Sequence, residues 1–231
     1  METKSPPVVA AFDLDGTLTE GGSVFPWLKS VAGRGRTWRA ALSLALPLTI
    51  GAVRSSRWAD HAKERLFLKL LAGIDEQVIA GESRTFAQGH LEHEGREPLL
   101  ARLAWHRAQG HDVVIVSASP QLYVDVMTEL LGAQGGLGTR LAVDPRGRLT
   151  GGYLGKNCRG SEKLRRLDEW ISERHYAAPP LIYAYGNSRG DRRMLRGATY
   201  PFNVGKLGWL GSLRRFPRLR ATDDATLSND G

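Results

Sequence analysis

The chain has 231 residues, 42% of them hydrophobic and 24% charged, as expected of a soluble protein with one large domain or one domain plus an insert. Its single cysteine, Cys158, excludes an intrachain disulfide and a zinc site built from several cysteines, and it fits a reducing compartment. The formal net charge of +8 favours anionic partners such as phosphates or acidic lipids. Neither zinc-finger spacing nor an RNA-binding aromatic motif occurs, so we expect no nucleic-acid ligand. The first residues, METKSPP, lack the apolar stretch of a signal peptide, and we therefore expect a cytoplasmic protein.

Short, nearly continuous apolar runs predict the strands. Such runs are typical of a parallel sheet that is covered by helices on both faces. They occupy residues 8–13, 112–119, 181–187 and, more weakly, 199–204. Helical segments lie between them, and this alternation favours an α/β fold with right-handed crossovers.

The region from about residue 20 to residue 100 carries no strong strand signal and is predicted to be a helical insert. Within 57–73, the residues Trp58, Ala62, Leu66 and Leu70 follow one another at helical spacing. The longest apolar run, residues 40–53, contains Pro47 and Gly51 and is too short to span a bilayer. It has two interpretations: a buried helix or helix pair, or a segment lying on a membrane surface between flanking arginines.

Two further segments have clear local signals. Residues 140–153 contain a turn at Asp144–Gly147 between two short β-like runs, which predicts a hairpin. A helix is predicted after the second strand, ending at Gly132. Another helix is predicted over 161–175, with Ser161 as its N-cap.

The first strand runs into two acids, Asp13 and Asp15. Side chains two residues apart on a strand point the same way, so both carboxylates face one site if the strand extends through Asp15. Ligands of open α/β sheets bind beyond the carboxyl ends of the strands. Two adjacent acids repel each other unless a cation compensates, and Mg²⁺ typically uses one or two carboxylates together with a substrate phosphate.

Other strand and helix ends carry complementary groups. Ser117 and Ser119 end the second strand, where hydroxyl and backbone N–H groups can hold phosphoryl oxygens. Lys163 lies in the first turn of a predicted helix, an unfavourable place for a cation unless it reaches an anion. Asn187 and Asp191 follow the third strand and offer oxygen ligands.

Together these residues resemble the haloacid dehalogenase superfamily of phosphohydrolases. The resemblance covers nearly the whole chain through four ordered motifs: Asp13-Leu-Asp15-Gly-Thr17, Ser117, Lys163, and Gly186-Asn187 to Asp191. The position of the helical insert resembles the phosphoserine-phosphatase-like branch. The resemblance implies a Rossmann-like parallel sheet core over 1–20 and 101–222 and a helical cap over 21–100. From its own sequence, the tail over 223–231 is expected to be disordered.

The resemblance also implies a role for each motif residue. Asp13 is expected to be the nucleophile, Asp15 the general acid and then base, and Thr17 the residue that orients Asp15. Ser117 is expected to hold the transferring phosphoryl group, and Lys163 to neutralise Asp13 and the phosphate. The expected substrate-binding set is Gly16, Thr17, Ala118 and Ser119. The expected Mg²⁺ ligands are Asp13, the backbone carbonyl of Asp15, Asn187 and Asp191.

One position departs from the family pattern, because Asn187 stands where an aspartate is usual. This substitution removes a negative charge from the expected metal site. It leaves open a different class of function, a scaffold that binds phosphorylated ligands without turning them over.

The substrate is predicted to be a phosphomonoester, either a small molecule or a lipid head group. The apolar run with flanking arginines resembles phosphatidylglycerophosphate phosphatases and implies contact with an anionic membrane, at its inner face. Free phosphoserine is the alternative. Against it, the loop reads Ser117-Ala-Ser119-Pro120 where phosphoserine enzymes usually have Ser-Gly-Gly, and Glu20 lies closer to the first motif than their substrate-binding glutamate does.

Overall fold

The structure, a computed structural model, describes residues 6–54, 56–206 and 212–219, with side chains described for 6–44, 60–206 and 212–219. The first half of the chain contains β1 (Val8–Phe12), α1 (Val24–Val31), α2 (Arg34–Arg54), α3 (Ser56–Leu71), α4 (Glu76–Glu94) and α5 (Glu97–Ala108). The second half contains β2 (Asp112–Pro120), α6 (Gln121–Leu131), β3 (Gly135–Thr139), β4 (Leu141–Val143), β5 (Leu149–Tyr153), α7 (Ser161–Ser172), β6 (Leu181–Gly186), the 3₁₀ helix η1 (Arg189–Asp191), α8 (Arg192–Gly197) and β7 (Tyr200–Asn203).

The central feature is a five-stranded sheet in the order β3-β2-β1-β6-β7, in which every neighbouring pair is parallel. This arrangement confirms the α/β prediction and all four predicted strands. The edge strand β3 was not predicted, because its sequence GGLGT has little intrinsic tendency to form a strand. It pairs with β2 and lies close to α6, where a methyl group on Gly136 would come 2.2 Å from Thr128 Oγ1.

Both faces of the sheet are buried, as the apolar strands predict. On β1, Ala10 and Phe12 point into a core shared with α5, α6 and the insert, whereas Val9 and Ala11 point into a second core shared with α7 and α8. The strand therefore has no exposed face, and its carboxyl end opens toward the site.

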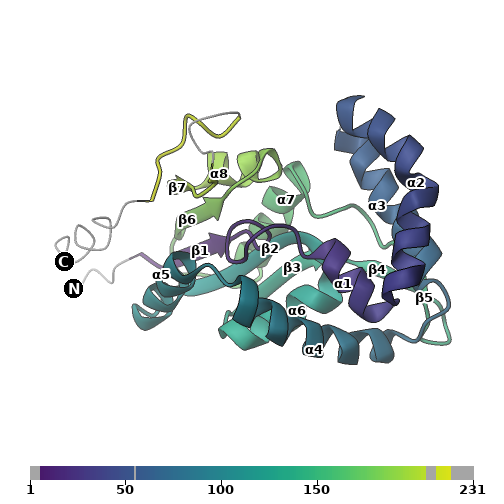
Figure 1. Cartoon of the computed structure of the whole chain (residues 1–231). Coiled ribbons are helices and arrows are strands. Elements are labelled where there is room, and N and C mark those ends of the chain that lie inside the picture. The colour runs from purple at the N-terminus through teal and green to yellow at the C-terminus, as the bar shows by residue number, and fades with distance from the viewer. Residues whose placement is uncertain (1–5, 55, 207–211, 220–231) are drawn as a thin grey trace, which may run out of the picture.

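Four helices, α1 to α4, occupy the stretch between β1 and α5 and confirm the predicted helical insert. Figure 1 shows α2 and α3 side by side, projecting away from the sheet, and α4 running beside α6. A buried hydrogen bond of 2.8 Å from Trp27 Nε1 to Ser83 Oγ joins α1 to α4. We retain the division into a core over 1–20 and 101–222 and a cap over 21–100 as a proposal.

The predicted hairpin is present, with β4 and β5 antiparallel around the turn at Asp144–Gly147. It packs on the helical insert: Leu149 N donates to Ile74 O at 2.9 Å, and Gly73 N donates to Leu149 O at 2.8 Å. A segment that the sequence places in the core therefore buttresses the C-terminal end of α3.

The apolar run 40–53 lies on α2, but its side chains from residue 45 onward are not described, and neither is the side chain of Trp58. The tail 223–231 lies outside the described residues. In the part that is described, Ala40 and Leu44 are buried, whereas Leu42 is 70% exposed. Among the helices that the structure describes, none is long and apolar enough to cross a membrane.

Candidate active site

A cavity of about 230 Å³ lies at the carboxyl ends of β1, β2 and β6. Six of the predicted site residues line it: Asp13, Asp15, Ser117, Ala118, Lys163 and Asp191. The cavity lining does not include four other predicted residues, Gly16, Thr17, Ser119 and Asn187. Each of these four contacts a lining residue or is next to one in the chain. The remaining lining residues are Val24, Asp60, Lys63, Asn157, Arg159, Ser188 and Gly190.

Asp13 lies at the centre of a buried charge cluster. Lys163 Nζ donates to Asp13 Oδ1 and, at 2.6 Å, to Asp191 Oδ1, and all three side chains are almost fully buried. The sequence prediction that Lys163 reaches an anion is therefore confirmed. The three side chains carry one positive and two negative charges when ionised, so the cluster keeps an excess of negative charge.

Burial shifts the pKa values of this cluster. Burial and the neighbouring Asp191 raise the pKa of Asp13 to about 7, although Lys163 opposes the change. For Lys163, burial disfavours the ammonium group, but the two carboxylates prevail and raise its pKa above the ordinary value. Lys163 is thus held as a cation, and it is the group that favours the ionised form of Asp13.

The role predicted for Thr17 is wrong in this structure. Thr17 Oγ1 donates to Asp13 Oδ2 at 3.1 Å instead of orienting Asp15. The reason is that β1 ends at Phe12 and residues 14–17 form a tight turn, in which Thr17 N donates to Leu14 O at 3.1 Å. The turn brings Thr17 back over Asp13.

The first strand ends at Phe12 and does not extend through Asp15. The carboxylates of Asp13 and Asp15 nevertheless line the same cavity. Asp15 is held at both oxygens: Ser23 N donates to Oδ1 at 2.7 Å, and Ser119 Oγ donates to Oδ2 at 2.6 Å. Ser119, predicted to bind substrate, therefore positions Asp15 here. Its own N–H donates to Ser117 Oγ at 3.0 Å.

The helix that carries Lys163 begins differently from the prediction. Ser161 is the first residue of α7, and Gly160 occupies the N-cap position without any side-chain cap bond, so the predicted Ser161 cap is wrong. Gly160 has a φ of 63°, which favours glycine, and its N–H donates to Gly190 O at 2.9 Å. This bond fixes the start of α7 beside η1 and thereby places Lys163 next to Asp191.

The loop after β6 is organised around Asp191. Its Oδ2 accepts from Ser188 N at 2.9 Å, Ser188 Oγ at 2.8 Å and Asn187 N at 3.2 Å. This leaves Oδ1 for Lys163.

Asn187 has its side chain against Gly16, where a methyl group would lie 1.9 Å from Nδ2. Gly16 also has a φ of 79°, so both its backbone conformation and the lack of space for a Cβ atom require glycine here.

The donor set suits a hard cation. Asn187 Oδ1 is buried and has no hydrogen-bond partner, and carboxylate oxygens of Asp13 and Asp191 lie in the same cluster. Within the described residues, no group of three or more His, Cys, Asp and Glu side chains is arranged to hold a metal ion. A cation bound here would therefore use two carboxylates, the Asn187 oxygen and the Asp15 backbone carbonyl, a set that fits Mg²⁺.

The lining residues that the sequence analysis missed include Asp60, Lys63, Asn157 and Arg159. Lys63, on α3, donates from Nζ to Asn157 Oδ1 at 2.6 Å and to Ala118 O at 2.8 Å. Burial lowers the pKa of Lys63 to about 8, although Asp60 and Asp15 oppose the change. The spacing of Asp60 and Lys63 puts both on one face of a helix, but no sequence signal shows that this face packs against the cavity.

Arg96, at the start of α5, was also missed. Its NH1 donates to Gly16 O at 2.5 Å and its NH2 to Val204 O at 3.1 Å, so it ties the first loop to the end of β7. Its Nε also lies 3.7 Å from Glu20 Oε1, and we treat Arg96 as a positioning residue.

Comparison with known proteins agrees with this geometry. The model of the haloacid dehalogenase-like hydrolase family matches residues 10–196, from β1 to α8. The chain belongs to this family.

One similar relative is the protein CicA of Caulobacter vibrioides, which is 37% identical over 191 residues, 82% of each chain. Another is a histidinol-phosphatase of Neisseria meningitidis, 23% identical over 85% of this chain and 89% of that one. A solved structure of a substrate-bound phosphoserine phosphatase superposes with a TM-score of 0.62 at 15% identity, over 97% of this chain and 99% of that chain. The last comparison supports the shared fold with a helical insert.

Proposed function

We propose that this protein is a Mg²⁺-dependent phosphomonoester hydrolase that acts through a phosphoryl group carried on Asp13. The observation that carries the proposal is the position of Asp13, held by Thr17 and Lys163 in a cavity that Asp15 and Ser117 also line. Membership of a hydrolase family and the likeness to a histidinol-phosphatase support it.

In the first half-reaction, an oxygen of the Asp13 carboxylate attacks the phosphorus atom, and the bond from phosphorus to the leaving oxygen breaks. Asp15 gives a proton to that oxygen, so the product leaves as an alcohol. Ser23 and Ser119 fix the Asp15 carboxyl group by its two oxygens, which keeps it in reach of the leaving group.

In the second half-reaction, Asp15, now ionised, takes a proton from water. The oxygen of that water attacks phosphorus, phosphate leaves, and the Asp13 carboxylate is restored. Lys163 and Ser117 line the cavity and are proposed to bind the phosphoryl oxygens throughout.

Magnesium, when bound by Asp13, Asp191, Asn187 and the Asp15 carbonyl, would supply positive charge against the phosphoryl oxygens. The excess negative charge of the Asp13–Lys163–Asp191 cluster supports this need.

The test is phosphate release with Mg²⁺ from p-nitrophenyl phosphate, phosphoserine, sugar phosphates and phosphatidylglycerophosphate in detergent. We expect release by the wild type that is lost in Asp13→Asn and on adding a chelator. Binding of phosphate without any turnover would favour the alternative that the Asn187 substitution suggests, a scaffold that binds phosphorylated ligands.

For the substrate, we propose a small or lipid head-group phosphomonoester, with phosphoserine as the alternative. The lipid version is supported by α2, where Trp38 is 53% and Leu42 is 70% exposed beside exposed arginines. Flotation with anionic vesicles tests it: Trp38→Ser/Leu42→Ser is expected to weaken vesicle binding without changing hydrolysis of p-nitrophenyl phosphate. Absence of wild-type binding at low salt would contradict it.

A further inference from the structure

A second cavity of about 360 Å³ opens beside the candidate active site. The two cavities share Asp60, Arg159 and Gly190 in their linings. Apart from Gly160 and Ser161, the rest of the second lining consists of Arg189, Arg192 and Arg193. We call this cavity, with its four arginines, the arginine basin.

The basin carries an excess of positive charge, with four arginines and one acid in its lining. The acid, Asp60, already has partners: Asn157 Nδ2 donates to its Oδ1 at 2.6 Å, and Arg159 NH1 lies 3.6 Å from the same oxygen. Among the described residues, no side-chain hydrogen bond or ion pair is found for Arg189, Arg192 or Arg193. These three arginines therefore line a hollow whose one acid, Asp60, is already paired.

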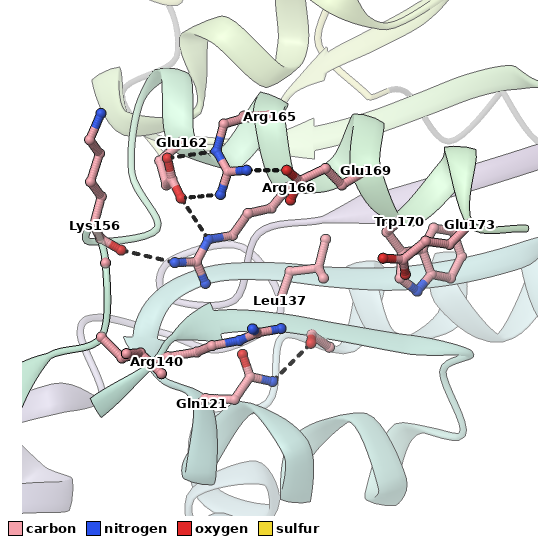
Figure 2. A pocket seen from close by; sticks show the side chains of 13 residues that line it. Gln121, Leu137, Arg140, Lys156, Glu162, Arg165, Arg166, Glu169, Trp170 and Glu173 are labelled. Atoms are coloured by element: carbon pink, nitrogen blue, oxygen red, sulfur yellow. Dashed lines mark hydrogen bonds and ion pairs between the residues drawn. The ribbon is translucent and has the colours of Figure 1, made fainter. Parts of the chain in front are cut away.

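A cavity of similar size on the other side of α7 shows what compensated charge looks like in this protein. It measures about 350 Å³ and its lining includes Arg165, Arg166, Glu162 and Glu169. Figure 2 shows these side chains bound to one another, with Glu162 shared by both arginines. In that network each arginine has a carboxylate partner within the protein, whereas Arg189, Arg192 and Arg193 have none among the described residues.

The basin is fixed to the catalytic cluster by the chain itself. Arg189 lies in η1, which ends at Asp191, and Arg192 is the next residue. Arg159 lies across Gly190, where a methyl group would come 3.2 Å from its Cγ and 3.3 Å from its Nε. Arg159 therefore stands at the junction of the two cavities.

We infer that the arginine basin binds a second, non-reacting phosphate on the substrate, so that the preferred substrate carries two phosphate groups. This inference rests on the proposed function for the place of the reacting phosphate. Arginine presents a planar fork of N–H donors that matches phosphate oxygens, and several such groups in one hollow favour phosphate over a neutral leaving group. The second phosphate can belong to a soluble bisphosphate or to the phosphodiester of a lipid head group.

The test uses Arg192→Gln/Arg193→Gln, with Arg196→Gln as a matched control, because Arg196 lies on the same helix and is not among the basin lining. Wild type is expected to use a sugar bisphosphate at least about 10-fold better than the matching monophosphate, in KM more than in kcat. The double variant should lose this preference and keep its rate on p-nitrophenyl phosphate, and the control should keep both. Phosphatidylglycerophosphate in detergent is the parallel arm, and the larger loss tells which source the basin serves.

Calorimetry on chains that also carry Asp13→Asn separates the two proposals. The basin variant should bind the bisphosphate, or the lipid, at least about 10-fold more weakly while its affinity for the monophosphate hardly changes. Equal weakening of all ligands, or no weakening, would overturn the basin. If the binding difference holds but wild type turns over no substrate, the basin stands and the proposed function fails.

Discussion

The two flanks of α7 carry charged side chains that are used in opposite ways. On one flank, Lys163 meets two buried carboxylates and leaves their charge only partly neutralised. On the other, Arg166 donates to Glu162 at 2.9 Å, to Lys156 O at 2.9 Å and to Gly138 O, so that it joins α7 to β3 and to the segment after β5. The named side chains on both flanks are largely buried. We call the Arg166 side the complete flank, because its charges are compensated within the protein, and the Lys163 side the incomplete flank.

In this fold, charges that serve the fold and charges that serve a ligand differ in how far the protein compensates them. A completed ion pair has no need of a ligand and contributes to holding elements in place. An incomplete cluster costs folding free energy, because charge is buried without full compensation, and it gains that free energy back only when a ligand binds. The Asp13 cluster keeps an excess of buried negative charge, and the arginine basin beside it is partly exposed and carries an excess of positive charge.

The largest expected effect comes from removing the cation of the incomplete flank, Lys163. Lys163→Met should lower phosphate release by about 10³-fold, because the cation that faces both Asp13 and the phosphoryl group is lost. It should also reduce the free energy of unfolding by about 3 kcal/mol, since two carboxylates then share a buried site. Phosphate release and urea unfolding measure the two effects. Activity close to that of wild type would show that Lys163 is only structural.

The matched change on the complete flank is Arg166→Leu. It should destabilise the fold by about 3 kcal/mol, because Gly138 O and Lys156 O lose their donor and Glu162 keeps only Arg165. The folded variant should retain kcat within about 3-fold of wild type, since Arg166 does not line the catalytic cavity. A loss of kcat as large as that of Lys163→Met, measured well below the unfolding temperature, would contradict the claim that Arg166 serves only the fold.

The complete flank also predicts an acid limit to stability. Hydrogen bonds from Arg165 and Arg166 lower the pKa of Glu162 from 4.5 to about 2, against the effect of burial. The unfolded chain then binds a proton more readily than the folded one, so this stabilisation is full above pH 4.5 and is lost as the pH falls toward 2. Between pH 4.5 and 3, wild type should lose about 2 kcal/mol more than Glu162→Gln in urea unfolding. Parallel curves for the two proteins would contradict the assignment.

The smallest expected effect concerns Asn187, which contributes no negative charge to the proposed Mg²⁺ site. Asn187→Asp adds a carboxylate beside Gly16 and should tighten Mg²⁺ binding by about 10-fold, as judged by calorimetry without substrate. Weaker or unchanged Mg²⁺ binding would show that the unpaired Asn187 oxygen does not face the cation.

The convergence of Asp13, Asp15, Ser117, Lys163 and Asp191 was predictable, because carboxyl ends of parallel strands meet at one edge of the sheet. Finer contacts were not predictable from the strand pattern. Thr17 turns back to Asp13 through a local hydrogen bond, and Gly160 fixes the start of α7 through a partner thirty residues away.

The contribution of the helical insert was hidden for a different reason. Lys63 and Asp60 reach the cavity only because α3 packs in one orientation on the hairpin, and the polar pattern of a helix does not tell what that face meets. The edge strand β3 was hidden because tertiary pairing overrides its glycine-rich sequence. The arginine basin could not be predicted from the sequence, since only the fold gathers Arg159 with the residues around η1.

The most direct test of the central claim, that the incomplete charge at Asp13 serves phosphoryl transfer, is to look for the phosphoryl group itself. Wild type incubated briefly with substrate and Mg²⁺ is quenched in acid, digested and examined by mass spectrometry. We expect one acid-stable, alkali-labile phosphoryl group on the peptide that contains Asp13, and none in Asp13→Asn. A peptide that stays unmodified while wild type releases phosphate, or a phosphoryl group on another residue, would contradict it.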